Sequence, residues 1–222
     1  MAPSKRLGLA VSLASKADSP IYFWREYGSQ HSYLSQWYPS PFTVSGTSIT
    51  YTTAEQYMMH QKAILFSDTE VALKILASQS PKEQKSLGRQ VSNFDDRIWE
   101  ENRERIVEEA SYWKFKTGKD EGVLKGEGVS LRDRLLATGD REVVEASPRD
   151  RIWGVGFGEN NAPKRRADWG LNLLGKALVV ARTKLREECT GNDGISDKAK
   201  EKGENVEDVR EGQKKRRRKS ED

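Results

Sequence analysis

The sequence has little cysteine or histidine and no long apolar run. Its 222 residues include one cysteine, Cys189, and two histidines, His31 and His60. One cysteine cannot form an internal disulfide, and three such side chains are too few for a structural zinc cage. No apolar run approaches the ~20 residues that a helix needs to cross a bilayer, and the mean hydropathy is −0.81. We therefore expect a soluble chain without membrane spans or bound metal.

An excess of one charge sign is also lacking. The chain has 38 Lys and Arg against 34 Asp and Glu, a net charge of +4, with 35% hydrophobic residues. This balance permits an anionic ligand without requiring one. The length is enough for one sizeable core and hardly two, so one globular domain is expected.

Composition divides the chain into three parts. All six tryptophans lie between Trp24 and Trp169, and we place the packed domain at residues 21–188. Residues 189–222 carry ten basic and nine acidic residues but only three large aliphatic ones, too few to offset the entropy of ordering, which predicts a disordered charged tail. Residues 1–20 faintly resemble a targeting peptide, but we expect an ordinary flexible N-terminus.

The tail ends in a basic block, Lys214 to Lys219. Such a block is typical of a nuclear-import signal read by an import receptor, and the alternatives are a solubilising tail or a contact with nucleic acid. The sequence thus predicts a cytoplasmic protein, a nuclear protein or both.

Pattern and capping signals predict a mainly α domain with a small β component. Residues 21–51 look like loops and a short hairpin that turns at Ser45-Gly46. From Thr53 onward, N-cap residues and helical spacing of apolar residues predict mostly helices. The expected helices run from Thr53 to Phe66, from Asp68 through Leu76, from the capping box at Ser80 to about Arg89, from Asp95 or Asp96 past Trp113, from Leu131 to Ala137, and from Asp168 to Glu188.

Several nucleotide and hydrolase motifs are missing. There is neither a G-x-x-x-x-G-K-[ST] phosphate loop nor a G-x-S-x-G nucleophile elbow. The glycines of Gly154-Val155-Gly156-Phe157-Gly158 are not spaced as G-x-G-x-x-G, and no buried strand is predicted before them. Kinase-like, serine-hydrolase and dinucleotide-binding functions are therefore disfavoured.

Two segments place carboxylates beside other functional groups. Glu55, Met59 and Lys62 share one helix face, so a carboxylate and an ammonium can point into one pocket, although such pairs are more often solvent-exposed. Residues 145–154 combine two acids, two arginines and a tryptophan. The structural alternative is a turn in which Asp150 caps backbone amides, with the tryptophans in the core.

The segment Thr53 to Ala63 resembles the T-x-E-x-Y-x-x-x-Q-K signature of the NADAR (YbiA-like) family. Other blocks agree in order across residues 21–188: Tyr38 to Phe42, Leu87 to Arg89, the helix of Trp99, Leu135 to Asp140, Glu145 to Gly156, and Gly170 to Gly175. The chain departs from the bacterial pattern at Gln56, where histidine is common, and near Ser35, where asparagine is common. The resemblance implies a single YbiA-like domain.

The resemblance further implies a cofactor-independent N-glycosidase. The associated substrates are phosphorylated ribosylamino-pyrimidine intermediates of riboflavin biosynthesis and ADP-ribose attached to guanine. Positions that matter in the family match Glu55, Trp99 and Asp150 here. An alternative is a binding module for ADP-ribose or a nucleotide that has lost catalysis.

An N-glycoside needs a carboxylate near the anomeric carbon and a proton donor near the base. We expect Glu55 to stabilise the oxocarbenium ion or activate water, and Asp150 to hold ribose hydroxyls or orient the water; these roles can be exchanged. Trp99 and Trp153 offer faces for base stacking. The candidates for the phosphate are Lys62 and Arg89, and Lys62 can alternatively form an imine with the opened sugar.

Overall fold

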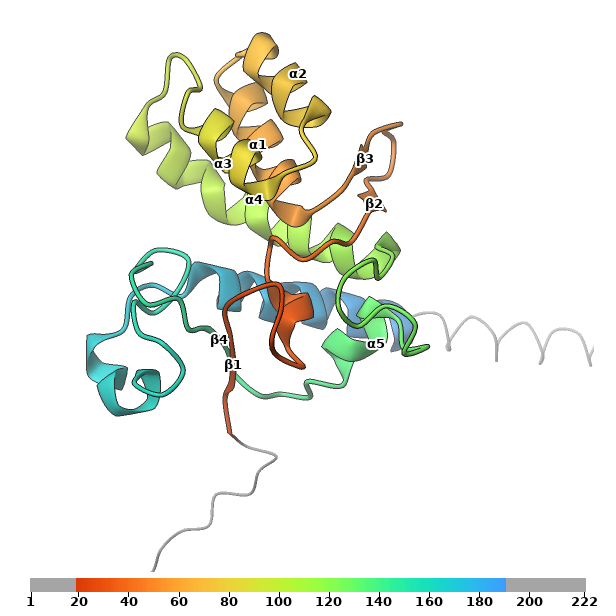
Figure 1. The fold of residues 1–222 in the computed structure, drawn as a ribbon, viewed down its shortest axis with the longest axis vertical. Coiled ribbons are helices and arrows are strands. Elements are labelled where there is room, and N and C mark those ends of the chain that lie inside the picture. The colour runs from red at the N-terminus through yellow and green to blue at the C-terminus, as the bar shows by residue number, and fades with distance from the viewer. Residues whose placement is uncertain (1–18, 191–222) are drawn as a thin grey trace, which may run out of the picture.

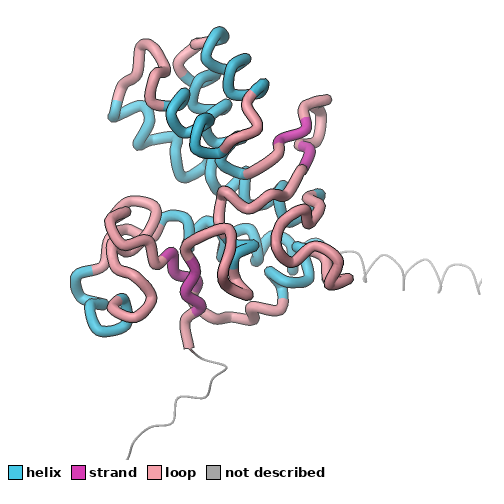
Figure 2. The backbone as a smooth tube through the Cα atoms, in the orientation of Figure 1, coloured by secondary structure: helices cyan, strands magenta, loops and turns pink. Residues whose placement is uncertain are grey.

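The structure is a computed structural model that describes residues 19–190. The predictions for the first 18 residues, for nearly all of the charged tail and for the basic block Lys214 to Lys219 lie outside the described residues. Within them, helices and loops predominate and strands are short (Figure 2). The prediction of a mainly α fold with a small β component is confirmed.

Five helices begin at or next to the residues where the sequence predicts their starts. Side chains at the N-caps accept hydrogen bonds from backbone amides in the first turn, which satisfies donors that a helix start leaves free. The helices and their N-caps are α1 Ala54–Leu65 with Thr53, α2 Thr69–Ala77 with Asp68, α3 Pro81–Gly88 with Ser80, α4 Asp96–Thr117 with Asp95, and α5 Leu131–Leu136 with Ser130.

The start of α3 departs from the predicted capping box. Ser80 accepts from the Glu83 amide as expected, but the Glu83 carboxylate accepts from the Ser78 hydroxyl at 2.6 Å and not from the Ser80 amide. The Ser80 amide instead donates to the Ser78 hydroxyl at 3.3 Å. The Ser78 hydroxyl thus stands between the Ser80 amide and the Glu83 carboxylate, which would bond directly in a capping box.

The predicted hairpin is present. Strands β2 Phe42–Thr43 and β3 Thr50–Tyr51 pair antiparallel, and Gly46 in the turn has φ of 81°. That backbone conformation favours glycine.

A second strand pair was not predicted. Strands β1 Ile21–Phe23 and β4 Val143–Glu145 pair in parallel, with Phe23 opposite Glu145. Because parallel strands end at the same edge, this pair brings the residues after Phe23 beside Glu145. Three-residue strands far apart in sequence give too short a pattern to recognise.

The last helix begins later than predicted. It covers residues 173–190, and a 3₁₀ helix, η2 Ala162–Asp168, ends where the prediction began it. Asn172 before the helix has φ of 51°. Its side chain accepts from the Glu145 amide and donates to the Val143 carbonyl, so it ties the helix start to β4.

The helices surround one main core. Helices α1, α2 and α3 pack together above, α4 crosses the molecule beneath them, and the last helix, drawn in blue, lies behind β1 and β4 (Figure 1). Ile106 and Ala110 of α4 are buried in this core, while Trp99 and Trp113 are partly buried against it. No helix among residues 19–190 has the length and apolarity to cross a membrane.

Candidate active site

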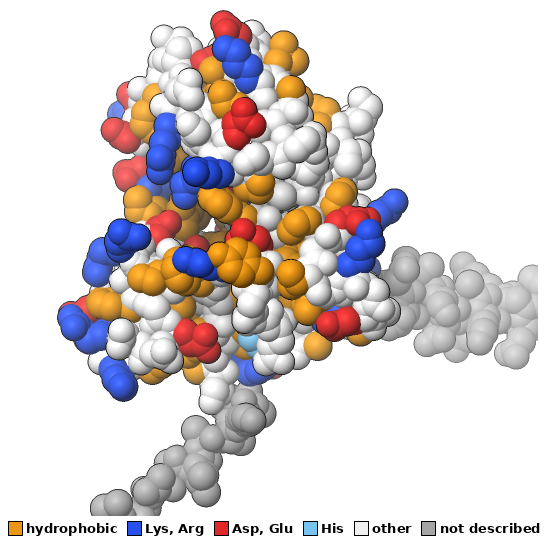
Figure 3. All heavy atoms as spheres, in the orientation of Figure 1, with side chains coloured by type: hydrophobic (Ala, Val, Ile, Leu, Met, Phe, Trp, Pro, Cys, Tyr) orange, Lys and Arg blue, Asp and Glu red, His pale blue; other side chains and the backbone are white. Residues whose placement is uncertain are grey.

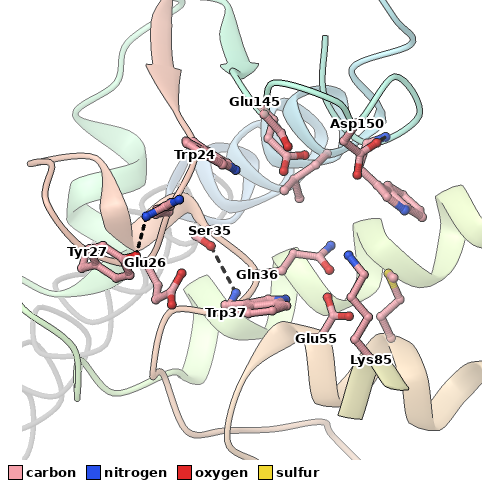
Figure 4. Close-up of a pocket in the computed structure, with 15 residues that line it drawn as sticks. Trp24, Glu26, Tyr27, Ser35, Gln36, Trp37, Glu55, Lys85, Glu145 and Asp150 are labelled. Atoms are coloured by element: carbon pink, nitrogen blue, oxygen red, sulfur yellow. Dashed lines mark hydrogen bonds between the residues drawn. The ribbon is translucent and has the colours of Figure 1, made fainter. Parts of the chain in front are cut away.

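A cavity of about 440 Å³ lies between α1 and α3 on one side and the loop after β4 on the other. A space-filling view shows a hollow with acidic, basic and hydrophobic side chains around it (Figure 3). The lining residues are Trp24, Arg25, Glu26, Tyr27, Ser35, Gln36, Trp37, Glu55, Met58, Lys85, Glu145, Ser147, Asp150, Trp153 and Leu174. Carboxyl groups and tryptophans thus come together from distant parts of the chain (Figure 4).

Glu55 stands in the first turn of α1, where the Thr53 cap fixes the start of the helix. Its side chain is 4% exposed, and its Oε1 has no hydrogen-bond partner. Burial raises the pKa of Glu55 to about 7, although the charge of Lys85 and the Trp37 indole oppose this rise. Glu55 can therefore both give and take a proton near neutral pH.

Glu145 is a second carboxyl group of the same kind. It ends β4, and its buried Oε2 has no hydrogen-bond partner. Burial raises its pKa to about 8, and the nearby charges of Asp150 and Glu55 add to the rise. Glu145 is one of the two acids for which residues 145–154 stand out in the sequence. The sequence analysis assigned a role only to the other acid, Asp150.

Asp150 serves the loop and also lines the cavity. Its Oδ1 accepts from the amides of Ile152 and Trp153 at 3.0 and 2.8 Å, so the capping turn given as the structural alternative is present. The loop then passes close to β4, since a Cβ on Gly154 would lie 2.7 Å from the Glu145 carbonyl oxygen. This close packing holds Asp150 on the wall that carries Glu145 (Figure 4).

Aromatic and basic side chains complete the lining. Trp153, predicted from the sequence, lines the cavity together with Trp24 and Trp37, which sequence reasoning missed. Lys85 of α3 and Arg25 at the exposed edge are the two lining cations. The charge of Lys85 lowers the pKa values of both Glu55 and Glu145, which places this ammonium in the field of both carboxyl groups.

Three other predicted residues lie outside this lining. The Lys62 ammonium donates to the Gly88 carbonyl at 2.8 Å and stands 4.0 Å from the Phe94 ring centre. Trp99 is partly buried against the core, and Arg89 is exposed. Glu55 and Lys62 thus do not line one pocket, because the Lys62 ammonium lies two turns further along α1, at the Gly88 carbonyl and the Phe94 ring. Arg89 acts at longer range, where its charge opposes the rise in the pKa of Glu55.

A buried lysine holds the wall formed by residues 35–37. Lys114 of α4 is 1% exposed, and its ammonium donates to the Ser35 carbonyl at 2.7 Å. Burial lowers the pKa of Lys114 to about 7. Next along the chain, the Gln36 carbonyl accepts from the Glu55 amide at 3.1 Å, so this wall and the start of α1 are fixed together.

The departure at Gln56 from the bacterial pattern has a structural role. Gln56 is 1% exposed, and its amide nitrogen donates to the carbonyls of Ile75 and Ser78 at 3.0 and 3.1 Å. It joins α1 to the end of α2 and does not line the cavity. Among residues 19–190, no group of three or more His, Cys, Asp or Glu side chains is arranged to hold a metal ion.

Comparisons with known proteins agree with this architecture. N-glycosidase R617 of Acanthamoeba polyphaga mimivirus is 40% identical over 162 residues, which are 70% of this chain and 86% of that protein. Riboflavin biosynthesis protein VVA0006 of Vibrio vulnificus is 30% identical over 175 residues, which are 79% of this chain but 41% of that protein. The NMR structure of the E. coli protein YbiA has a TM-score of 0.58 at 27% identity, covering 78% of this chain and 88% of that one.

The NADAR domain family matches residues 22–186, nearly the range over which the sequence motifs agreed. The predictions of the family and of an N-glycosidase are confirmed by this match and by the relatives. The cavity, with its carboxyl groups and tryptophans, is thus the candidate active site of a chain that belongs to the NADAR family.

Proposed function

We propose that the cavity hydrolyses the ribose C–N bond of phosphorylated riboflavin-biosynthesis intermediates. The observation that carries this proposal is the meeting of two buried carboxyl groups with pKa values of about 7 and about 8 in one cavity. At neutral pH such a pair offers one group that can accept a proton and one that can donate it. The names of the relatives, N-glycosidase and riboflavin biosynthesis protein, support the reaction and the substrate class.

In the proposed reaction, Glu145 donates its proton to the leaving nitrogen as the C–N bond breaks and the bonding electrons move to that nitrogen. Ionised Glu55 faces the positive charge that develops on the ribose ring and takes a proton from the attacking water. The water oxygen forms the new bond to the anomeric carbon. The products are the free sugar phosphate and the amine, so one water molecule is consumed.

The remaining lining residues bind the substrate. Asp150, held by two backbone amides, orients the water or a ribose hydroxyl, as the sequence predicted. Trp153 and Trp37 offer flat faces to the base, and such stacking contributes ~1–3 kcal/mol per base. The lining cations Lys85 and Arg25 replace Lys62 and Arg89 as the candidates for the phosphate. We propose that Trp99 and Lys62 support the wall behind the site.

A specific observation favours a second candidate function, the removal of ADP-ribose from guanine. A smaller cavity of about 160 Å³ shares Trp24, Arg25 and Tyr27 with the first. Arg25 stacks over the Trp24 ring at 4.3 Å from its centre, and both side chains are exposed. A substrate with a second nucleotide half can extend along this edge.

One assay separates the two functions. Purified protein is given a phosphorylated ribosylamino-pyrimidine and, in parallel, an oligonucleotide with ADP-ribosylated guanosine. We expect release of ribose 5-phosphate from the first substrate. Release of ADP-ribose from the second alone would move the assignment to the modified nucleic acid. Binding of ADP-ribose without cleavage of either substrate would indicate the non-catalytic module.

For the basic block Lys214 to Lys219, we propose recognition by an import receptor, which places the protein in the nucleus as well as the cytoplasm. The support is its run of six basic residues. Deleting residues 213–222 from a tagged chain should shift it to the cytoplasm. An unchanged distribution would leave a solubilising or nucleic-acid-binding tail as the explanation.

A further inference from the structure

The cavity contains a buried side-chain amide that no protein group satisfies. Gln36 is 8% exposed and lines the cavity, and its Nε2 is buried without a hydrogen-bond partner. A buried donor without a partner is costly and rare. In a wall of a binding cavity, this arrangement indicates a donor that a ligand satisfies.

The backbone around Gln36 is fixed on both sides. The preceding carbonyl, that of Ser35, accepts from the buried Lys114 ammonium, and the carbonyl of Gln36 itself accepts from the amide of Glu55. The amide side chain therefore projects from a rigid wall, which makes it suitable for recognition. Figure 4 shows it among the labelled side chains of the cavity, close to Glu55 and Lys85 in that view.

An acceptor without a partner accompanies this donor. Oε1 of Glu55 is buried and unpaired, and Glu55 adjoins Gln36 through the backbone hydrogen bond. A sugar hydroxyl both accepts and donates a hydrogen bond, so neighbouring hydroxyls can satisfy the amide and the carboxylate together. A phosphate dianion has only acceptors, so it can satisfy the Gln36 amide but cannot donate to the unpaired Glu55 oxygen, which repels it.

We propose that Gln36 and Glu55 bind the vicinal hydroxyls of the ribose, so that the sugar enters with its diol against this wall and its phosphate toward the exposed Arg25. This inference rests on the proposed function, because it names the orientation of the substrate in the same site. It makes Gln36 a specificity residue that distinguishes ribose from deoxyribose.

The test measures binding without turnover. Ribose 5-phosphate and 2-deoxyribose 5-phosphate are titrated by calorimetry into the full chain and into Gln36→Met, a change that keeps side-chain length and removes the amide. We expect wild-type protein to bind the ribose compound about tenfold more tightly, the usual effect of one buried hydrogen bond. In Gln36→Met this preference should fall toward one, mainly through weaker binding of the ribose compound.

Gln90→Met is the matched control, since Gln90 is exposed and outside the cavity. If Gln36→Met fails to fold by circular dichroism, the comparison is made with Gln36→Asn, where the preference should fall in part. An unchanged preference in a folded Gln36 variant would overturn the inference. Inorganic phosphate is titrated into both proteins as well, and loss of its binding in the variant would also overturn the inference, because Gln36 would then hold the phosphate.

The outcomes separate this inference from the proposed function. Preferential binding of ribose without any hydrolysis would contradict the proposed reaction and support the orientation of the sugar. Hydrolysis with equal binding of both sugars would support the reaction and contradict the role of Gln36.

Discussion

Glu55→Gln should remove activity and also stabilise the folded chain at alkaline pH. Gln keeps the shape of the side chain but cannot ionise. In the folded chain the pKa of Glu55 is about 7, against an ordinary value of 4.5, so the folded state holds its proton more tightly than the unfolded state does. Stability is therefore lost as pH rises through this interval, and Glu55→Gln escapes that loss.

The size of the effect follows from the two pKa values. Each tenfold change in proton affinity corresponds to about 1.4 kcal/mol. Between about pH 5 and pH 8, the variant should gain about 2–3 kcal/mol in free energy of unfolding relative to wild type. The charge of Glu55 also raises the pKa of Glu145, so Glu55→Gln relieves this repulsion as well, and the relief adds to the gain.

Urea unfolding followed by tryptophan fluorescence at the two pH values provides the measurement. Asp133→Asn is a suitable control, because Asp133 lies on α5 outside the cavity. Parallel stability profiles for wild type and Glu55→Gln would refute the claim that this carboxyl group is buried with a raised pKa. Wild-type turnover in Glu55→Gln would refute its role in the reaction.

Three further predictions concern the walls of the cavity. The pH profile of kcat/KM should be bell-shaped, with limbs near the pKa values of about 7 and about 8. Glu145→Gln should lower the rate ~10²–10⁴-fold and abolish the alkaline limb. An alkaline limb that persists in this variant would show that another group donates the proton. Trp153→Ala should raise KM by roughly 5- to 150-fold, the equivalent of one stacking contact. Trp99→Ala should lower the melting temperature without changing KM. The reverse pattern would show that the base stacks on Trp99. Lys114→Met should lower kcat/KM about tenfold, because it removes one hydrogen bond to the wall formed by residues 35–37. Lys116→Met on the same helix should leave kcat/KM unchanged, because that lysine pairs with Glu188 at 2.9 Å. Equal activities of the two variants would show that the wall does not need the Lys114 hydrogen bond.

The helices could be predicted because their signals are local. Each N-cap side chain accepts a hydrogen bond from an amide only three residues further along the chain, so neighbouring positions in the sequence are enough to predict the helix start. The caps are Thr53, Asp68, Ser80 and Asp95. The parallel pair of β1 and β4 could not be predicted in the same way. Its six residues carry no turn or periodic pattern, and the pairing depends on the core that forms around it.

The sequence likewise predicted part of the site and missed the rest. Glu55 and Asp150 came from the family resemblance, and the cavity brings both together with Trp153. Glu145 was given no role and Trp24 was missed because only the pairing of the parallel strands brings their segments together. Lys114 was missed because a lysine on a charged helix is usually exposed. Lys62 was misplaced because helix-face spacing gives direction around the axis but not position along the cavity.

Cleavage of a ribose C–N bond in this cavity should depend on Glu55. The most direct test follows ribose 5-phosphate released from a phosphorylated ribosylamino-pyrimidine by the full chain, by Glu55→Gln and by Asp133→Asn. We expect one ribose 5-phosphate for each amine released by the full chain and by Asp133→Asn, and none above background from folded Glu55→Gln. Equal release by Glu55→Gln, or no release by the full chain, would contradict this expectation.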